Sequence, residues 1–227
     1  MNIPFMIISG LAMLVSRWVG GRLQKRFAEF SQLPISMSGR EVAEKMLADR
    51  NISDVSVIST GGQLTDHYNP RDKTVNLSTV VYEQRNIAAA AVAAHEVGHA
   101  VQHSTSYAFL TMRSKLVPMV NISSKLSQWV IMAGFALAAT GNYYVFMIGI
   151  ALFSMTTLFT LVTLPVEFNA SSRALNWLEE TRISEQYQSQ AKNALFWAAM
   201  TYTVAAIASL GQLLYFIMRF LAMKNRR

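Results

Sequence analysis

Long apolar runs separated by polar segments dominate the chain, and this pattern predicts several membrane-spanning helices. One run covers residues 4–20, two adjacent runs lie within 116–164, and the last covers 194–222. A helix needs about 20 mainly apolar residues to cross a bilayer. The pattern therefore predicts an N-terminal membrane helix over 4–20, a transmembrane hairpin over 116–164 that turns at Gly141-Asn142, and a C-terminal membrane helix over 194–222. These helices make four crossings.

Basic residues follow the first apolar run and do not precede it. Arg17 lies near the end of the run, and Arg22, Lys25 and Arg26 come directly afterwards. A secretory signal has its positive charge before the apolar run and small residues after it. The reverse order predicts a membrane anchor that is not cleaved, with Arg17 reaching to the membrane surface.

The polar segment over residues 27–114 has the pattern of a small region with both helices and strands. Ser38, followed three residues later by Glu41, predicts the start of a helix. An alanine-rich stretch over 86–103 predicts a second helix, which is too polar to face lipid and therefore belongs inside the protein. A further polar segment over 166–192 is expected to be helical.

Two short strands are expected between these helices. Residues 55–58 and 74–78 are rich in β-branched and apolar side chains, and 74–78 alternates between apolar and polar positions. The residues between them, from His67 to Asp72, predict a turn. This part of the chain is therefore expected to contain a short sheet.

The composition narrows the chemistry that the chain can carry. Hydrophobic residues make up 52% and charged residues 15%, whereas about a quarter of the residues of a soluble domain are charged. There is no cysteine, which excludes disulfides, thiolate metal ligands and a cysteine nucleophile. The net charge is +7, but many basic residues lie beside apolar runs, where they suit anionic lipid head groups better than nucleic acid. A lipid bilayer is the expected partner, and nucleic acid is not.

The alanine-rich helix contains His95-Glu96-Val97-Gly98-His99, an H-E-x-x-H motif. Residues four apart on a helix differ by about 40° and about 6 Å of rise, so the two imidazoles point at one place. A zinc ion about 2.1 Å from each nitrogen fits there. Glu96 is then the candidate general base for a zinc-activated water. Two unrelated core histidines beside an exposed glutamate are the alternative interpretation, which the placement of the motif on a helix disfavours.

A catalytic zinc needs a third protein ligand, and the chain offers two candidates. His103 lies on the same helix but about 12 Å along its axis from His95, which is too far for one tetrahedral ion. Glu167 directly follows the apolar hairpin, and two crossings return the chain to the side of the membrane that it left. Glu167 is therefore the expected third ligand, and His103 is expected at the helix end or beside the ligands.

Three segments resemble the YugP-like family of bacterial membrane zinc metallopeptidases, namely AAHEVGHAVQH, DHYNPRDKTVNLS and LPVEFNASSRAL. The architecture is also similar to the HtpX and CAAX-prenyl-protease group of integral-membrane gluzincins. The resemblance implies that a glutamate on a later helix completes the zinc site in the pattern E-x-x-A-(D)-x-x-A. Glu167, Ala170 and Ala174 match this pattern. Ser171 stands at its acidic position, and Asn169 stands where YugP-like sequences often carry Asp.

The same resemblance implies a place for the substrate. It assigns residues 74–78 to the edge strand of the sheet, where an extended peptide can add as a further strand. An ordinary structural strand is the alternative interpretation.

These observations predict a mainly α fold, an integral-membrane helical protein with a small α+β zincin-like metallopeptidase domain that contains a short sheet. Residues 1–227 are expected to form a single membrane metallopeptidase domain. The expected function is that of a zinc-dependent endopeptidase that cleaves peptide or protein substrates with a zinc-activated water. One Zn²⁺ per chain is expected on His95, His99 and Glu167, with Glu96 as the catalytic base. A non-catalytic zinc-binding scaffold of the same fold and a transporter with an intramembrane metal are the alternatives.

The basic residues also predict an orientation in the bacterial cell membrane. The positive-inside rule places the active site on the cytoplasmic side together with Arg22, Lys25, Arg26, Arg113, Lys115 and Lys125. Four crossings then put the basic C-terminus outside, against the same rule.

Three further polar residues each allow a functional and a structural interpretation. His67, in the predicted turn, can lie near the oxyanion or can have no function. Arg173 can pair with the ligand carboxylate or face solvent, and Tyr187 is equally ambiguous.

Overall fold

The computed structural model describes residues 3–138 and 140–225, most of which are helical. The elements in chain order are α1 (Ile3–Phe30), α2 (Gly39–Asp49), β1 (Ser56–Thr60), β2 (His67–Asn69), β3 (Thr74–Ser78), α3 (Thr79–Glu83), α4 (Ile87–Ser104), α5 (Ala108–Ala138), α6 (Tyr144–Glu180), a 3-10 turn (Glu185–Tyr187) and α7 (Gln188–Lys224). Their described residues divide into two compact units. The first lies within residues 1–17, 112–164 and 202–227, and the second within 18–111 and 165–201.

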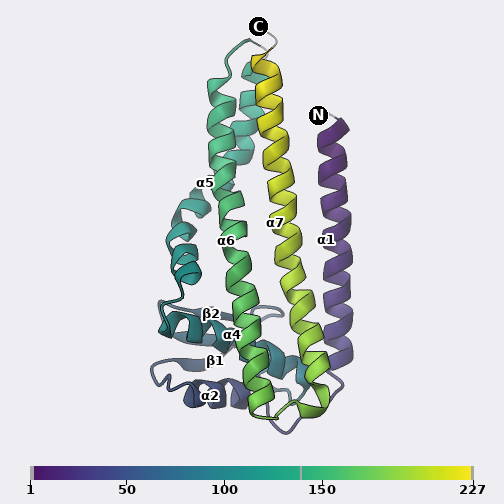
Figure 1. Ribbon diagram of the computed structural model, residues 1–227, viewed down its shortest axis with the longest axis vertical. Helices are drawn as coiled ribbons and strands as arrows, with labels where there is room; N and C mark the ends of the chain where they lie inside the picture. Colours follow the sequence, from purple (N-terminus) through teal and green to yellow (C-terminus); the bar gives the residue numbers. More distant parts are fainter. Residues whose placement is uncertain (1–2, 139, 226–227) are drawn as a thin grey trace. The chain divides into compact units, whose positions relative to one another are not determined.

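The described residues of the first unit are mostly helical, and the unit contains most of the apolar runs. Its parts of α5, α6 and α7 run side by side (Figure 1), and Ile131, Phe146 and Phe216 form its buried core with Tyr215. A hydrogen bond of 2.9 Å between the hydroxyls of Thr160 and Ser209 joins α6 to α7. Such bonds between polar side chains help membrane helices to associate, because lipid offers them no other partner.

Three helices of the described chain are long and apolar enough to cross a membrane. They are α1, α6 and the combined segment Glu185–Lys224. Four crossings are predicted from the sequence. The fourth predicted membrane helix, α5, is not one of these three candidates. It forms as a helix at the predicted place, but it carries Arg113, Lys115 and Lys125. The crossing by α5 therefore stays a prediction.

Helix α6 continues through Pro165 to Glu180. The sequence interpretation ends the second hairpin helix at Pro165 and begins a separate helix over 166–192, and this division is wrong. Proline lacks an N–H and crowds the preceding turn, but long membrane helices tolerate it because neighbouring groups satisfy the freed carbonyl. The chain instead breaks after Glu180, where a turn and the 3-10 segment lead into α7.

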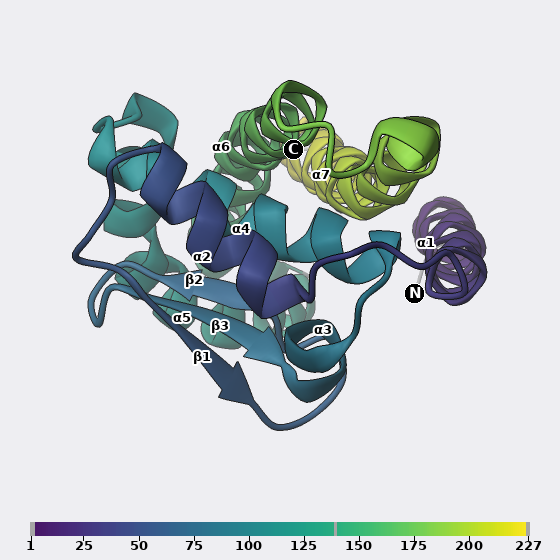
Figure 2. The ribbon, with the colours of Figure 1, turned by 90° about the horizontal axis from the view of Figure 1, so that it is seen from below.

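The second unit contains the sheet and the helices that cover it. Figure 2 shows α2 and α4 side by side over one face of the three strands. Helix α2 begins as predicted, because the Ser38 side chain accepts from the Glu41 N–H and the Glu41 carboxylate accepts from the Ser38 N–H. This capping box satisfies N–H groups that the first turn of a helix leaves without partners.

The strand order in the sheet is β1-β3-β2. Strand β3 pairs with β1 in parallel and with β2 in antiparallel orientation. Residues 74–78 therefore form the central strand, and their assignment to the edge is wrong. The predicted turn from His67 is also wrong at its start, since His67–Asn69 form strand β2. The outer edges of the described sheet belong to β1 and β2.

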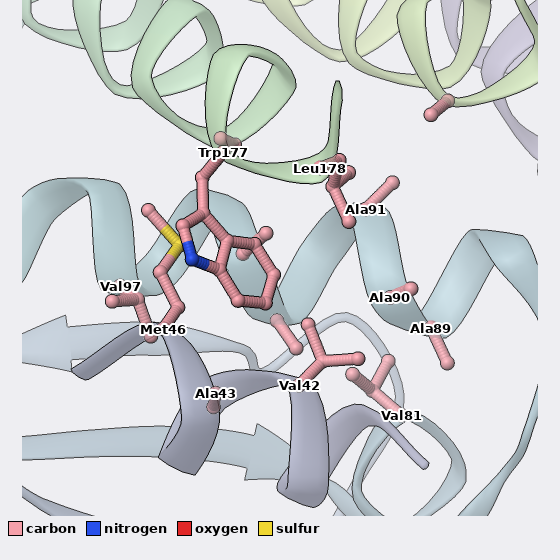
Figure 3. Close-up of a cluster of buried hydrophobic side chains, with 14 of the residues drawn as sticks. Val42, Ala43, Met46, Val81, Ala89, Ala90, Ala91, Val97, Trp177 and Leu178 are labelled. Carbon is pink, nitrogen blue, oxygen red and sulfur yellow. The ribbon is translucent and has the colours of Figure 1, made fainter. Parts of the chain in front are cut away.

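A dense apolar core joins α2, α4 and the C-terminal part of α6. Figure 3 shows Met46 of α2, Val97 of α4 and Trp177 of α6 in this core, where each of the three side chains is at most 1% exposed. The Trp177 indole N–H donates to the Asp49 carboxylate at 3.0 Å. This packing fixes the last turns of α6 against α4, the helix that carries the motif.

Candidate metal centre

Helix α4 places the two motif histidines on one face. The helix begins at the N-cap Asn86, whose side chain accepts from the Ala89 N–H, and it covers the predicted range. The rings of His95 and His99 are 4.8 Å apart, one helical turn from each other. Residues four apart in a helix lie on the same face, so the helix by itself brings the two rings together, as the sequence predicts.

Glu167 of α6 completes a three-residue group with these histidines. Its Oε2 lies 3.2 Å from His95 Nε2 and 3.7 Å from His99 Nε2. One ligand atom from each of the three residues lies within 4.8 Å of the others, so the group could hold a metal ion. The Glu167 side chain is only 2% exposed. The structure thus brings together the three residues that the sequence selects as ligands.

A close approach of two helices makes this geometry accessible. Gly98 of α4 lies against the backbone of Ala170 in α6, and a β-carbon at Gly98 would meet the Ala170 carbonyl oxygen at 2.6 Å. Glycine leaves room for such an approach because it has no side chain. Since Gly98 is next to His99 and Ala170 is one turn beyond Glu167, the contact draws the histidines and the carboxylate together.

The donor set and its spacing suit zinc. Ligands about 2.0–2.1 Å from a tetrahedral ion stand about 3.4 Å apart, and two imidazoles with one carboxylate are a known catalytic set. The two distances from Glu167 to the histidines, 3.2 and 3.7 Å, match this spacing. The residues present therefore fit a zinc ion.

Each histidine also contacts a polar group at its other ring nitrogen. His95 Nδ1 lies 3.1 Å from the Ser171 hydroxyl, and His99 Nδ1 lies 3.0 Å from the Gln102 amide oxygen. Such partners orient ligand histidines. The sequence interpretation overlooked Gln102, although its place three residues after His99 on the same helix puts it within reach.

Glu96 lies beside the group and is largely buried. Burial raises the pKa of the Glu96 carboxyl to about 7, with Glu167 and Asp66 adding to the rise and His95 and His67 opposing it. A general base works best when its pKa lies near the working pH. A cation held by the neighbouring ligands would favour the ionised carboxylate.

Four other predicted candidates lie outside the metal group. His103 accepts or donates a 2.7 Å hydrogen bond with the Tyr68 hydroxyl, and Arg173 donates to the Asn169 amide oxygen at 2.8 Å. His67 is exposed and its Nδ1 is 2.7 Å from the Thr65 carbonyl oxygen. Tyr187 packs against the apolar core of the second unit.

Comparison with known proteins defines the class. The family described as "Putative neutral zinc metallopeptidase" matches residues 5–221, and the chain belongs to this family. Among individual proteins, the chain is 40% identical over 220 residues to the "Putative membrane protease YugP" of Bacillus subtilis (strain 168), and the match covers 96% of both chains. No solved structure matches the chain. The resemblance to the YugP-like family is confirmed, and the chain is a member of a zinc peptidase family with candidate membrane helices.

Proposed function

We propose that this protein is a membrane-bound zinc metalloendopeptidase of the gluzincin type. His95, His99 and Glu167 hold one zinc ion per chain, and Glu96 is the catalytic base. The observation that carries the proposal is that two imidazoles of α4 and a buried carboxylate of α6 place their ligand atoms within 4.8 Å of one another. A glutamate as third ligand, supplied by a later helix, distinguishes this arrangement from sites with a third histidine.

The residues of the chain have defined tasks in peptide hydrolysis. Bound zinc supplies a Lewis acid that polarises the scissile carbonyl and lowers the pKa of water to about 7. Glu96 accepts the proton of the attacking water and delivers it to the leaving amine. The buried setting of Glu96 supports this role, because it keeps the carboxyl's pKa close to neutral.

Three ligands favour catalysis over a structural zinc site. A closed structural site has four protein ligands, whereas a catalytic site keeps one position open. The metal group found among the described residues has three members. The remaining histidine of the helix, His103, would have to be the fourth ligand, but it forms a hydrogen bond with Tyr68. A non-catalytic scaffold is therefore the weaker alternative.

We also infer that an extended substrate binds along the outer edge of β2. Peptides commonly add to exposed strand edges through main-chain hydrogen bonds. The described sheet has two outer strands, β1 and β2. What favours β2 is that His67, its first residue, and the preceding Asp66 are among the charges that act on Glu96.

Chain connectivity supports four crossings with the site on one side. Residues 18–111 and 165–201 belong to one compact unit, and α6 enters this unit from an apolar span. If α6 crosses the bilayer, α5 must cross it as well, because both helices connect that unit with residues 140–143. We propose that this unit faces the cytoplasm, where the basic residues flanking the spans are favoured.

Zinc content and peptidase activity, measured together, test the function. The full chain, purified in detergent, is expected to bind one zinc and to cleave an unfolded protein. Glu96→Gln is expected to keep the zinc and to lose activity by about a hundredfold or more, since general acid–base catalysis contributes about 10²–10⁴. Glu83→Gln, an exposed change in the same unit, serves as control.

Each other outcome has a definite meaning. Zinc binding without cleavage in the wild type supports the scaffold alternative. An active Glu96→Gln protein, or a wild type that binds no zinc, contradicts the proposal.

A further inference from the structure

Gln102 lies at the centre of a buried hydrogen-bond network behind the candidate metal ligands. Its side chain is fully buried. The amide nitrogen donates to the Val166 carbonyl oxygen at 2.7 Å and to the Asn169 side-chain oxygen at 3.0 Å. The amide oxygen lies 3.0 Å from His99 Nδ1. Every polar atom of Gln102 therefore has a partner inside the protein, as burial requires.

Two groups in the network have only one possible hydrogen-bonding role, and these roles determine how the Gln102 and Asn169 side-chain amides are oriented. A main-chain carbonyl such as that of Val166 only accepts, so the Gln102 atom facing it must be the NH₂ group. A guanidinium only donates, so the Asn169 atom that receives Arg173 Nε at 2.8 Å must be the amide oxygen. The same Asn169 oxygen receives Gln102, which agrees with the first assignment.

This orientation determines the proton position on His99. With its NH₂ group held by Val166 and Asn169, Gln102 turns its oxygen toward His99. An oxygen without hydrogen only accepts, so Nδ1 of His99 carries the proton. The neutral imidazole then has its lone pair on Nε2, the atom that faces Glu167. That form is the one that binds a metal through Nε2.

The second histidine lacks such a constraint. His95 Nδ1 faces the hydroxyl of Ser171, which can donate or accept. The hydroxyl therefore allows either tautomer of His95. The fixed direction is specific to His99, and it depends on residues of both α4 and α6.

We propose that Gln102 is a positioning residue that holds His99 in its metal-binding tautomer, and that Asn169 and Arg173 hold the Gln102 amide in the required orientation. The zinc part of this inference rests on the proposed function. The tautomer part concerns the metal-free protein and stands independently of it.

Gln102→Met tests the proposal, because methionine has a similar length but forms no such hydrogen bonds. Gln188→Met is the matched control. Gln188 is a part-buried glutamine, whose side-chain amide donates to the Leu175 carbonyl oxygen and accepts from the Ser184 hydroxyl. Both changes remove hydrogen bonds in the same unit, but only Gln102 contacts a candidate ligand.

Two measurements distinguish positioning from a structural role. The chain has four histidines, so nitrogen-15 histidine spectra of the metal-free protein in detergent report each tautomer. His99 is expected as the Nδ1–H form in wild type and in Gln188→Met, and this signature is expected to be lost in Gln102→Met. Zinc affinity, measured by competition with a chelator, is expected to fall 10- to 100-fold in Gln102→Met, the usual effect of losing an outer-shell partner.

If Gln102→Met fails to fold, a second pair of variants tests the same proposal. Asn169→Asp keeps an oxygen that accepts from Gln102 and Arg173, and it is expected to keep both the tautomer and the zinc affinity. Asn169→Leu removes that oxygen and is expected to weaken zinc binding.

The outcomes separate this proposal from the proposed function. A wild type with His99 as the Nε2–H form, or wild-type zinc affinity in both Gln102→Met and Asn169→Leu, overturns the inference. A wild type that binds no zinc contradicts the proposed function, while the tautomer spectra still decide the role of Gln102.

Discussion

A β-carbon added at Gly98 of α4 would stand 2.6 Å from the main-chain carbonyl oxygen of Ala170 in α6. The two helices thus meet backbone to backbone between the motif histidines and Glu167. The three atoms nearest to the added carbon all belong to the Ala170 backbone, which cannot move aside as a flexible side chain can. The spacing of the candidate metal centre therefore depends on the absence of a single side chain.

Gly98→Ala is expected to separate the two helices and to weaken both folding and zinc binding. Overpacking of this kind costs typically about 1–3 kcal/mol, which outweighs the higher helix propensity of alanine. Gly21→Ala, in an open part of helix α1 with no atom within 4 Å of the added carbon, is the control and is expected to be neutral or stabilising. Thermal unfolding and chelator competition measure the effects. Unchanged values for Gly98→Ala would show that the helices part without cost.

Glu167→Gln is expected to abolish tight zinc binding while leaving the helices formed. An amide keeps the size of the side chain but removes the negative charge that a zinc ligand supplies. The zinc affinity should fall by more than about a hundredfold, the upper end for loss of an outer-shell partner. Glu179→Gln, an exposed change on the same helix, should bind zinc like the wild type. Zinc analysis with circular dichroism checks both points, and full zinc occupancy of Glu167→Gln would rule out this ligand.

Removal of the metal is expected to stop peptide cleavage reversibly. A strong zinc chelator should inactivate the full chain, and added Zn²⁺ should restore the activity. Mg²⁺ should not restore it, because that ion prefers oxygen ligands and octahedral geometry over two imidazoles. Recovery with Mg²⁺, or activity that persists in metal-free protein, would contradict the proposed centre.

Trp177 is expected to be a main source of stability for the unit that carries the site. Trp177→Ala should cost about 3–5 kcal/mol, the usual range for a buried tryptophan. Trp177→Phe keeps most of the packing and loses the hydrogen bond to Asp49, so its cost should be nearer about 1 kcal/mol. Unfolding curves in detergent with chelator present separate these effects from zinc binding. Equal costs for the two variants would assign the stability to the hydrogen bond instead of the packing.

The proposed docking along β2 predicts a dependence on the substrate backbone. A peptide inhibitor with N-methyl groups at alternate residues lacks the N–H donors that pair with a strand edge. It is expected to bind at least about tenfold more weakly than its unmethylated parent, since each lost hydrogen bond costs about 0.5–1.5 kcal/mol. Two such peptides are needed, one methylated at the odd and one at the even positions, because only one set of N–H groups faces the strand edge. Their inhibition constants are compared with that of the unmethylated parent. Equal inhibition by all three peptides would argue against pairing with β2.

The sequence by itself determined the local features of this protein. The helical repeat places His95 and His99 on one face, and Ser38 with Glu41 marks the start of α2. These features depend on residues within one or two turns of each other, so periodicity and capping rules suffice. The apolar runs likewise predict the membrane helices by length and composition. The place of Glu167 directly after the apolar hairpin selects it as the third ligand, and the resemblance to a family agrees with this choice.

Only the tertiary structure decided which distant segments meet. The central place of β3, the continuation of α6 through Pro165 and the network around Gln102 involve partners that no sequence spacing specifies. Strand order follows from pairing between segments far apart in the chain, and a glycine in a helix pattern does not reveal which backbone it approaches. Position 98 has room only for glycine because the Ala170 carbonyl of another helix, 72 positions further along the chain, lies against it.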